Sequence, residues 1–592
     1  MIRATFAGFS TAMSALQANQ KRLDISGQNL SNMNTPGYTR QALQVSSVNY
    51  TNPISHYMNG SEVAVGFGVH MDKVTQIRDP YLDIQYRNQM DKSGYTDAMQ
   101  ASLDRLSDVF DESHVNGIWS AFEDIRSTLI NIQDLGKVND PIYEAEFRSK
   151  MQALTNLLND ASNQIDVAEQ IEYTKLDGTG TSERGAVQEV NDILRQIGNL
   201  NRQIKQNQIF GQQSLELMDE RNVLLDELSS YIPIEVTYYK DINYDGKDDG
   251  PLYNYDSNGK IIGKREWPDD LRVEMVYNDK DGKPQKLTLV EGTIGSDKDN
   301  YGEVKISKRI PNDPTSVELT FSGYNNYKDG VPPQDKSEIP FSMKITPGNP
   351  DTAAITNSFA SDSGSIQASL DMLWKDGKTE GINDKRGYEY YRGELDHLAR
   401  SFAKVMNELN IRGNYSKQVP NDHYLLSSKD DDSSDYNKIT AKNIGISAGW
   451  QSGKVQVGTG TEEDENQVAT ILNMLEAFKS TYPNDNKNLI DSLDTSLGNY
   501  IDLDNNTFAD YMNHISTIVA NDSYNNTNAL KTNVTVLNGI QNSRDSVSGV
   551  SLDEEASNMM MYMSAYNAAS RLMTTLDQAL DVLINSTGTV GR

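Results

Sequence analysis

Apolar side chains recur every three or four residues at both ends of the chain. From residue 2 to residue 30 the steps alternate strictly between four and three, and seven of the nine positions are apolar. A repeat sustained over this many turns predicts a coiled-coil seam rather than an isolated surface helix. The positions are Ile2, Phe6, Phe9, Met13, Leu16, Gln20, Leu23, Gly27 and Leu30.

The last helical stretch carries a matching repeat. It opens with Ser551 and Glu554, the spacing of a capping box, and one step of three replaces a four after Tyr566. Each helix alone also fits an ordinary amphipathic core helix. The match between the two ends favours a bundle built from both of them. The C-terminal positions are Leu552, Ala556, Met559, Met563, Tyr566, Ala569, Met573, Leu576, Leu580 and Leu583.

A rigid turn is predicted directly after the first helix, in the segment "NTPGY" (34–38). Pro36 fixes its own φ and disfavours the helical conformation of Thr35, and Gly37 tolerates a positive φ. The ring of Tyr38 can pack while its hydroxyl stays in water. We therefore expect Asn34, Thr35, Pro36 and Gly37 to end the first helix, so that the chain can leave a densely packed layer.

In the middle of the chain the sequence pattern changes from helical to β-like and then back to helical. Residues 232–344 alternate apolar with polar and contain Asp-Gly or Asn-Gly turns, which predicts β-hairpins. The turns are at 245–246, 258–259 and 281–282. Outside this region, helices are expected at 80–110, 144–172, 186–228 with an interruption near Gly211, 388–410, 467–480 and 530–543.

The predicted fold class is therefore multidomain: an α-helical coiled coil or bundle built from both chain ends, with inserted mainly-β material. We expect residues 1–45 and 546–592 to form the terminal coiled coil. The remaining division is a mainly helical domain (46–231, 359–420 and 500–545), an inserted β domain (232–358) and a smaller mixed insertion (421–499).

Composition narrows the possible partners and the chemistry. Lys and Arg total 54 against 84 Asp and Glu, a net charge of −30, which argues against nucleic acid or an anionic membrane as a partner. The absence of cysteine excludes disulfides, zinc–thiolate sites and thiol nucleophiles. No apolar run approaches the roughly 20 residues that span a bilayer. The start also lacks the apolar core of a signal peptide, so we expect a cytoplasmic protein or one that leaves the cell without a cleaved signal.

Candidate chemistry is sparse. No two of the six histidines fall within one helical turn, and neither a nucleophile elbow nor a phosphate loop is present. We expect no catalytic residue, no cofactor and no enzyme activity. One weak calcium candidate is Asp241, Asn243, Asp245 and Asp249, which fit the first nine positions of a calcium loop. Leu252 stands where the bidentate Glu belongs, and a polar β-turn is the alternative interpretation.

Both ends resemble one known family. "SALQANQKRLDISGQNLSNMNTPGYTRQ" (14–41) and the segment 546–585 are similar to the N- and C-terminal signatures of the axial proteins of the bacterial flagellum, the rod, hook and hook-associated proteins. The forms "NTPGYTRQ" (34–41) and "SGVSLDEE" (548–555) suit the hook-associated members of the hook–filament junction better than the hook protein. The segments 66–87, 190–236 and, more weakly, 363–410 resemble their helical region.

The resemblance implies an extracellular structural protein of the flagellum that joins hook to filament and is exported without a cleaved signal peptide. Its expected partners are further copies of itself, the hook protein, the second junction protein and filament, and a cytoplasmic export chaperone at the C-terminus. The expected assembly seam is Phe6, Phe9, Met13, Leu16, Leu23, Leu30, Asn34, Pro36, Gly37, Tyr38, Leu552, Met559, Met563, Tyr566, Met573, Leu576, Leu580 and Leu583.

Two alternatives stay open. The first is hook protein or another axial component. The second is of another class: a β insertion that binds calcium or a glycan, or that has hydrolytic activity.

Overall fold

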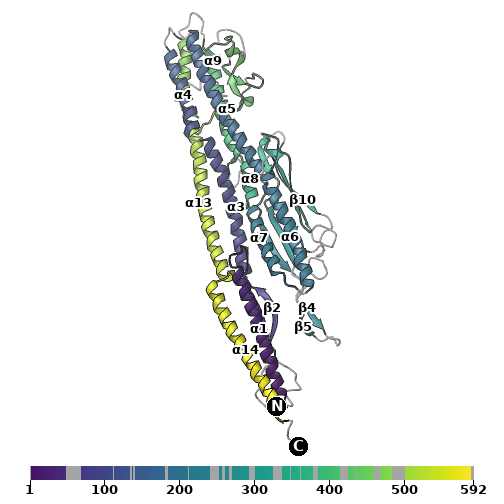
Figure 1. Cartoon of the computed structure of the whole chain (residues 1–592). Helices are drawn as coiled ribbons and strands as arrows, with labels where there is room; N and C mark the ends of the chain where they lie inside the picture. Colours follow the sequence, from purple (N-terminus) through teal and green to yellow (C-terminus); the bar gives the residue numbers. More distant parts are fainter. Residues whose placement is uncertain are drawn as a thin grey trace.

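Two long helix pairs lie end to end along the molecule (Figure 1). Helix α1 (Ile2–Ser31) pairs with α14 (Leu552–Thr587), and α3 (Pro80–Val109) pairs with α13 (Phe508–Ser548). The start of α1 and the end of α14 lie side by side at one tip of the molecule. The computed structural model describes residues 2–48, 68–110, 112–133, 137, 140–179, 184–210, 212–239, 252–255, 261–265, 270–292, 300–311, 313–324, 336–346, 349–360, 362–377, 385–413, 424–433, 435–458, 467–482 and 501–587.

The terminal pair is antiparallel and keeps one register along its length. A Cβ placed on Gly8 would lie 3.4 Å from Leu576 Cδ1. The Arg22 guanidinium lies 5.4 Å from the centre of the Tyr562 ring, and Asn29 Nδ2 lies 3.3 Å from Glu555 Oε1. The outer contacts are 21 residues apart on both helices (29 − 8 = 576 − 555 = 21). The predicted bundle of the two chain ends is thereby confirmed.

A short antiparallel hairpin, β1 (Gln41–Ser47) with β2 (Val69–Gln76), contacts α1 and leads into α3. At the far end of α3 and α13 the first apolar core gathers helices from distant parts of the sequence. Phe122 and Phe402 meet edge to face at 5.3 Å, and Phe508 stacks on Phe122. The further elements there are α4 (Glu112–Ile132), α5 (Pro141–Asp177), α9 (Tyr388–Gly413), β12 (Leu426–Ser428), β13 (Ile444–Ile446), α10 (Ala448–Gln451) and α11 (Gln467–Lys479).

The inserted β region packs beside the long helix pairs, on α6 (Ala186–Ile209), α7 (Leu215–Tyr231) and α8 (Ser365–Trp374) (Figure 1). One sheet has the order β3-β6-β7 and another the order β11-β10-β9-β8. A second apolar core contains residues of these helices and of both sheets. The strands are β3 (Ile234–Tyr239), β4 (Leu252–Tyr255), β5 (Ile261–Arg265), β6 (Asp270–Asn278), β7 (Pro284–Val290), β8 (Glu303–Ile306), β9 (Glu318–Gly323), β10 (Ser337–Thr346) and β11 (Asn349–Ile355).

Most predicted elements are present, and the differences concern three helices. The turn at 281–282 does close a hairpin between β6 and β7, with Gly282 at φ +73°. The turns predicted at 245–246 and 258–259 lie outside the described residues. Helices α4 and α8 were not predicted, and α13 is far longer than the expected 530–543. No helix in the described ranges is both long and apolar enough to span a bilayer.

Candidate functional site: the joint between the helix pairs

Helix α1 ends in two successive tight turns. Thr35 N donates to Asn32 O at 2.9 Å, and Tyr38 N donates to Thr35 O at 3.2 Å. Pro36 and Gly37 occupy the two central positions of the second turn, and Gly37 has φ +76°, as a type II turn requires. The predicted stop after the first helix is therefore confirmed.

The turn lies against α7. A Cβ placed on Gly37 would come within 2.2 Å of Val223 Cγ2, far inside van der Waals contact. Gly37 is thus required twice, by its backbone conformation and by the close approach of α7. Through this contact the exit from α1 is fixed on the helical body of the molecule.

A buried polar network joins the end of α1 to the start of α14. The Asn29 amide donates to Gln41 O at 3.0 Å and to Glu555 Oε1 at 3.3 Å. Its carbonyl oxygen accepts from Gln41 N at 3.0 Å and from the Tyr38 hydroxyl at 2.9 Å. Burial, followed by the charges of Asp219, Glu216 and Glu555, raises the pKa of Tyr38 to about 12. Tyr38 therefore stays protonated and can donate this bond.

Arg40 links the turn to the break between α13 and α14. Its backbone N–H donates to Ser548 O at 2.9 Å. Its guanidinium donates to Glu555 Oε1 and to Glu554 Oε2, each at 2.8 Å. The serine half of the predicted capping box is present, with Glu554 N 3.5 Å from Ser551 Oγ. The Glu554 carboxylate, however, binds Arg40 of the other chain end.

Asp219 on α7 anchors the next residue of the turn segment. Its carboxylate accepts from Thr39 N at 3.1 Å and from Thr39 Oγ1 at 2.6 Å. Burial raises the pKa of Asp219 to about 6, against the opposing effect of these two hydrogen bonds. The carboxylate is ionised at neutral pH and holds Thr39 on α7.

Arg544, one turn before the end of α13, secures the other side of the joint. It pairs with Asp83 at 3.0 Å and with Asp226 at 2.6 Å, and its guanidinium lies 4.8 Å from the centre of the Tyr86 ring. Arg87 also pairs with Asp226, at 2.9 Å. These contacts tie α3, α7 and α13 together where α14 begins.

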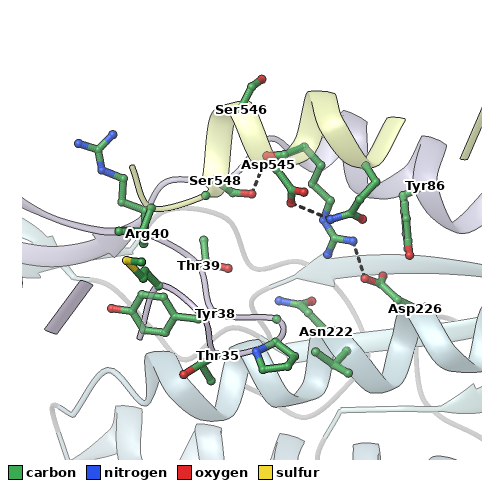
Figure 2. Close-up of a pocket in the computed structure, with 18 of the residues that line it drawn as sticks. Thr35, Tyr38, Thr39, Arg40, Tyr86, Asn222, Asp226, Asp545, Ser546 and Ser548 are labelled. Atoms are coloured by element: carbon green, nitrogen blue, oxygen red, sulfur yellow. Dashed lines mark hydrogen bonds and ion pairs between the residues drawn. The ribbon is translucent and has the colours of Figure 1, made fainter. Parts of the chain in front are cut away.

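Between these anchors lies a cleft of about 840 Å³. Figure 2 shows Thr35, Tyr38 and Thr39 on one wall and Tyr86, Asp226 and the end of α13 on the other. Residues 35–40 and 545–551, more than 500 positions apart, thus line one hollow. We call this region, the turn 32–40 with its contacts on α3, α7, α13 and α14, the joint.

The expected seam residues on α1 and α14 whose side chains the structure describes divide into two groups. Half-buried members lie between or beside the paired helices: Phe9, Leu16, Leu23, Leu30, Met559, Tyr566, Met573, Leu576 and Leu580. Exposed members lie on the outer surface of the pair: Met13, Leu552, Met563 and Leu583. The side chain of Phe6 lies outside the described residues, and Asn34, Pro36 and Gly37 are exposed in the turn.

The calcium candidate, Asp241, Asn243, Asp245 and Asp249, lies outside the described residues. Within the described part of the chain, no group of three or more His, Asp or Glu side chains is arranged to hold a metal ion. The sequence reasoning also missed the polar residues of the joint, Asn29, Arg40, Asp219, Arg544 and Glu555. Asn29, Arg40 and Glu555 lie within the two terminal motifs and Arg544 stands two residues before the second, whereas Asp219 lies in the segment 190–236. Nothing else in the sequence marked them as one site.

Comparison with known families gives three matches along the chain. The flagellar hook-associated protein FlgK helical domain matches residues 103–304. The flagella basal body rod protein family matches residues 9–39, and the C-terminal family of the flagellar basal body rod FlgEFG proteins matches residues 541–586. The first of the end matches contains the turn up to Thr39, and the second contains the end of α13 and the start of α14, so both reach the joint.

Individual relatives agree with these matches. Flagellar hook-associated protein 1 of Bacillus subtilis is 26% identical over 607 residues, covering 99% of each chain. The protein of that name from Salmonella typhimurium is 25% identical and covers 97% of this chain and 98% of its own. A solved structure, the flagellar hook junction protein FlgK of Burkholderia pseudomallei, is 17% identical with a TM-score of 0.34, covering 58% of this chain and 46% of that one. That structural likeness is too low to carry an argument.

Proposed function

The chain is a homologue of flagellar hook-associated protein 1 and a structural component of the bacterial flagellum, and we propose that it assembles at the hook–filament junction through α1 and α14. One observation carries the proposal: the two terminal motifs, which match the families of axial proteins, meet in the joint. The joint ends the α1–α14 pair and directs the rest of the chain outward.

The exposed surface of α14 supports a role in self-assembly. Met560, Met561 and Met563 are more than half exposed, as is Ile584 near the C-terminus. An exposed apolar stripe on a long helix marks a contact surface, and methionine adapts to more than one neighbour. We propose that further copies of the chain cover this stripe in the assembled flagellum, with the hook on one side and the filament on the other.

The same stripe supports a transient partner before export. In the cytoplasm an exposed Met-rich helix invites aggregation. We propose that an export chaperone covers α14 until the chain leaves the cell without a cleaved signal peptide, and that this binding and assembly exclude each other. We further propose that the protein has no enzymatic activity.

Immunogold labelling of isolated flagella tests the proposal. Labelling confined to the boundary between hook and filament supports the junction function. Labelling along the whole hook would show that the protein is a different axial component.

A further inference from the structure

The seams of the two helix pairs differ in composition. After Val519 no residue of α13 is buried, and all of residues 520–548 are described. The seam positions are half-buried and spaced four, three, four, three and four: Asn526, Leu530, Asn533, Leu537, Ile540 and Arg544. Amides therefore stand at positions where the α1–α14 seam carries mostly apolar side chains.

The amides of α13 meet amides of α3. Gln100 Nε2 donates to Ser523 Oγ at 2.9 Å, and Gln100 Oε1 accepts from Asn526 Nδ2 at 3.0 Å. Seven residues along α13, Asn533 Oδ1 accepts from Gln89 Nε2 at 3.1 Å.

Backbone carbonyls of α3 complete these contacts. Asn526 Nδ2 donates to Thr96 O at 2.9 Å, and Asn533 Nδ2 lies 3.4 Å from Lys92 O. Carbonyls recur on every turn of any helix, so they do not distinguish one partner from another. The discriminating contacts are those between side chains. Four amides, Gln89, Gln100, Asn526 and Asn533, make most of them, and we call these four the amide set; the hydroxyls of Ser523, Thr527 and Thr96 add to them.

We propose that the amide set selects the partner of α3, so that α3 accepts α13 and rejects α14, whether of its own chain or of a second copy. A polar residue at a seam position costs stability but specifies the pairing. An apolar helix laid on α3 would remove the side-chain partners that α13 supplies, Asn533 Oδ1 for Gln89 and Asn526 Nδ2 for Gln100, and would leave Gln100 only its bond to Asp104 Oδ1 within α3 (2.7 Å). That loss disfavours the apolar partner.

The need for this selection follows from the exposed surface of α14. Its Met560, Met561 and Met563 are exposed on the monomer and lie on the helix that continues from α13. Once several copies gather, as the proposed function requires, every α3 has several α14 helices nearby. An apolar α3 seam would accept them and exchange helices between copies, as happens in domain swapping. Gln89 and Gln100 make that exchange unfavourable.

Cross-linking between copies tests this, because the chain contains no cysteine. One full-length copy carries Lys92→Cys, on the exposed flank of the α3 seam, and a second carries Met563→Cys. A short bis-maleimide then joins the two cysteines only when α14 of one copy lies on α3 of another, and the yield of cross-linked dimer measures that pairing. Introducing Gln89→Leu and Gln100→Leu into both copies should raise the cross-linked yield about tenfold, the factor for 1.4 kcal/mol of pairing free energy.

The matched control adds leucine outside the seam, as Asn88→Leu with Ala101→Leu, both exposed on α3. Its cross-linked yield should equal that of the parent pair. Far-UV circular dichroism checks the fold, and the single variants Gln89→Leu and Gln100→Leu serve if the double variant unfolds. An unchanged yield in the seam variants overturns the proposal, and so does an equal rise in the control, which would show simple surface stickiness.

Discussion

Replacing Gly37 by alanine would place a methyl group where α7 already lies. The new Cβ would be 2.2 Å from Val223 Cγ2, whereas carbon atoms in contact lie about 3.5–4.0 Å apart. The turn or the Val223 side chain must therefore shift by more than about 1 Å to relieve the overlap. In addition, the φ of +76° costs an L-residue about 1–2 kcal/mol.

These two effects should open the joint. A cost of about 1–2 kcal/mol corresponds to a factor of about 5–30 in the population of the opened state. The amides that report opening are Arg40 N, which donates to Ser548 O, and Gln41 N, which donates to Asn29 Oδ1. Hydrogen exchange at both amides should accelerate by that factor in Gly37→Ala.

Two further variants separate the causes. Gly27→Ala changes a glycine of α1 where an added Cβ would meet no atom within 4 Å, so exchange at the joint should not change. Adding Val223→Ala to Gly37→Ala removes the steric overlap but not the backbone strain, so exchange should return only part of the way. Parent-like exchange in Gly37→Ala itself would refute the argument that α7 and the turn constrain this position.

Three other changes test separate features. Burial raises the pKa of Asp91 on α3 from 3.8 to about 7, so the folded state binds this proton more tightly than the unfolded state does. The free energy of unfolding therefore rises as pH falls from 8 towards 4. Asp91→Asn should therefore stabilise the protein by about 2–4 kcal/mol at pH 8 and by almost nothing at pH 4, and a pH-independent difference in thermal unfolding would contradict this. Asn191 on α6 binds both Val304 O (2.8 Å) and Val304 N (2.7 Å) of edge strand β8, so Asn191→Leu should free that edge and lower the concentration at which light scattering detects aggregates. On α14, Leu576→Asp should separate the helix from α1, because Leu576 lies near Gly8. Met563→Asp lies on the exposed side of α14, so it should block polymerisation and chaperone pull-down while the α1–α14 pair persists. A Met563→Asp chain that loses assembly but keeps full chaperone affinity would show that the chaperone binds another segment.

The sequence predicted those parts of the fold that depend on local or periodic signals. The terminal pair follows from apolar residues at every third or fourth position, and the turn follows from Pro36 and Gly37, whose backbone preferences act within one or two residues. The hairpin at Asp281 and Gly282 is of the same kind. Each of these features is decided by neighbours along the chain.

What was missed depends on contacts between distant segments. The seam of α13 carries amides at Asn526 and Asn533 among its apolar positions, so the apolar repeat is interrupted and the expected helix covered only 530–543 of α13. Its hydrogen-bond partners, Gln89 and Gln100, stand more than 400 residues earlier. The role of these polar positions can be recognised only once α3 is known to lie beside α13, because α3 supplies their hydrogen-bond partners.

The two chain ends depend on each other in the same way at the joint. Glu555 is 2% exposed, and a carboxylate buried to that degree is tolerated only when it is paired and hydrogen-bonded. Its partners, Asn29 and Arg40, both come from the N-terminal segment. Conversely, Asn29 and Arg40 need that carboxylate to satisfy their own donors. The segment 9–39, which Arg40 directly follows, and the segment 541–586 match two separate families of axial proteins, yet Asn29, Arg40 and Glu555 bond one another only when both segments are present. The two terminal segments are therefore halves of one structural unit, and a chain that carries only one of them cannot build the joint.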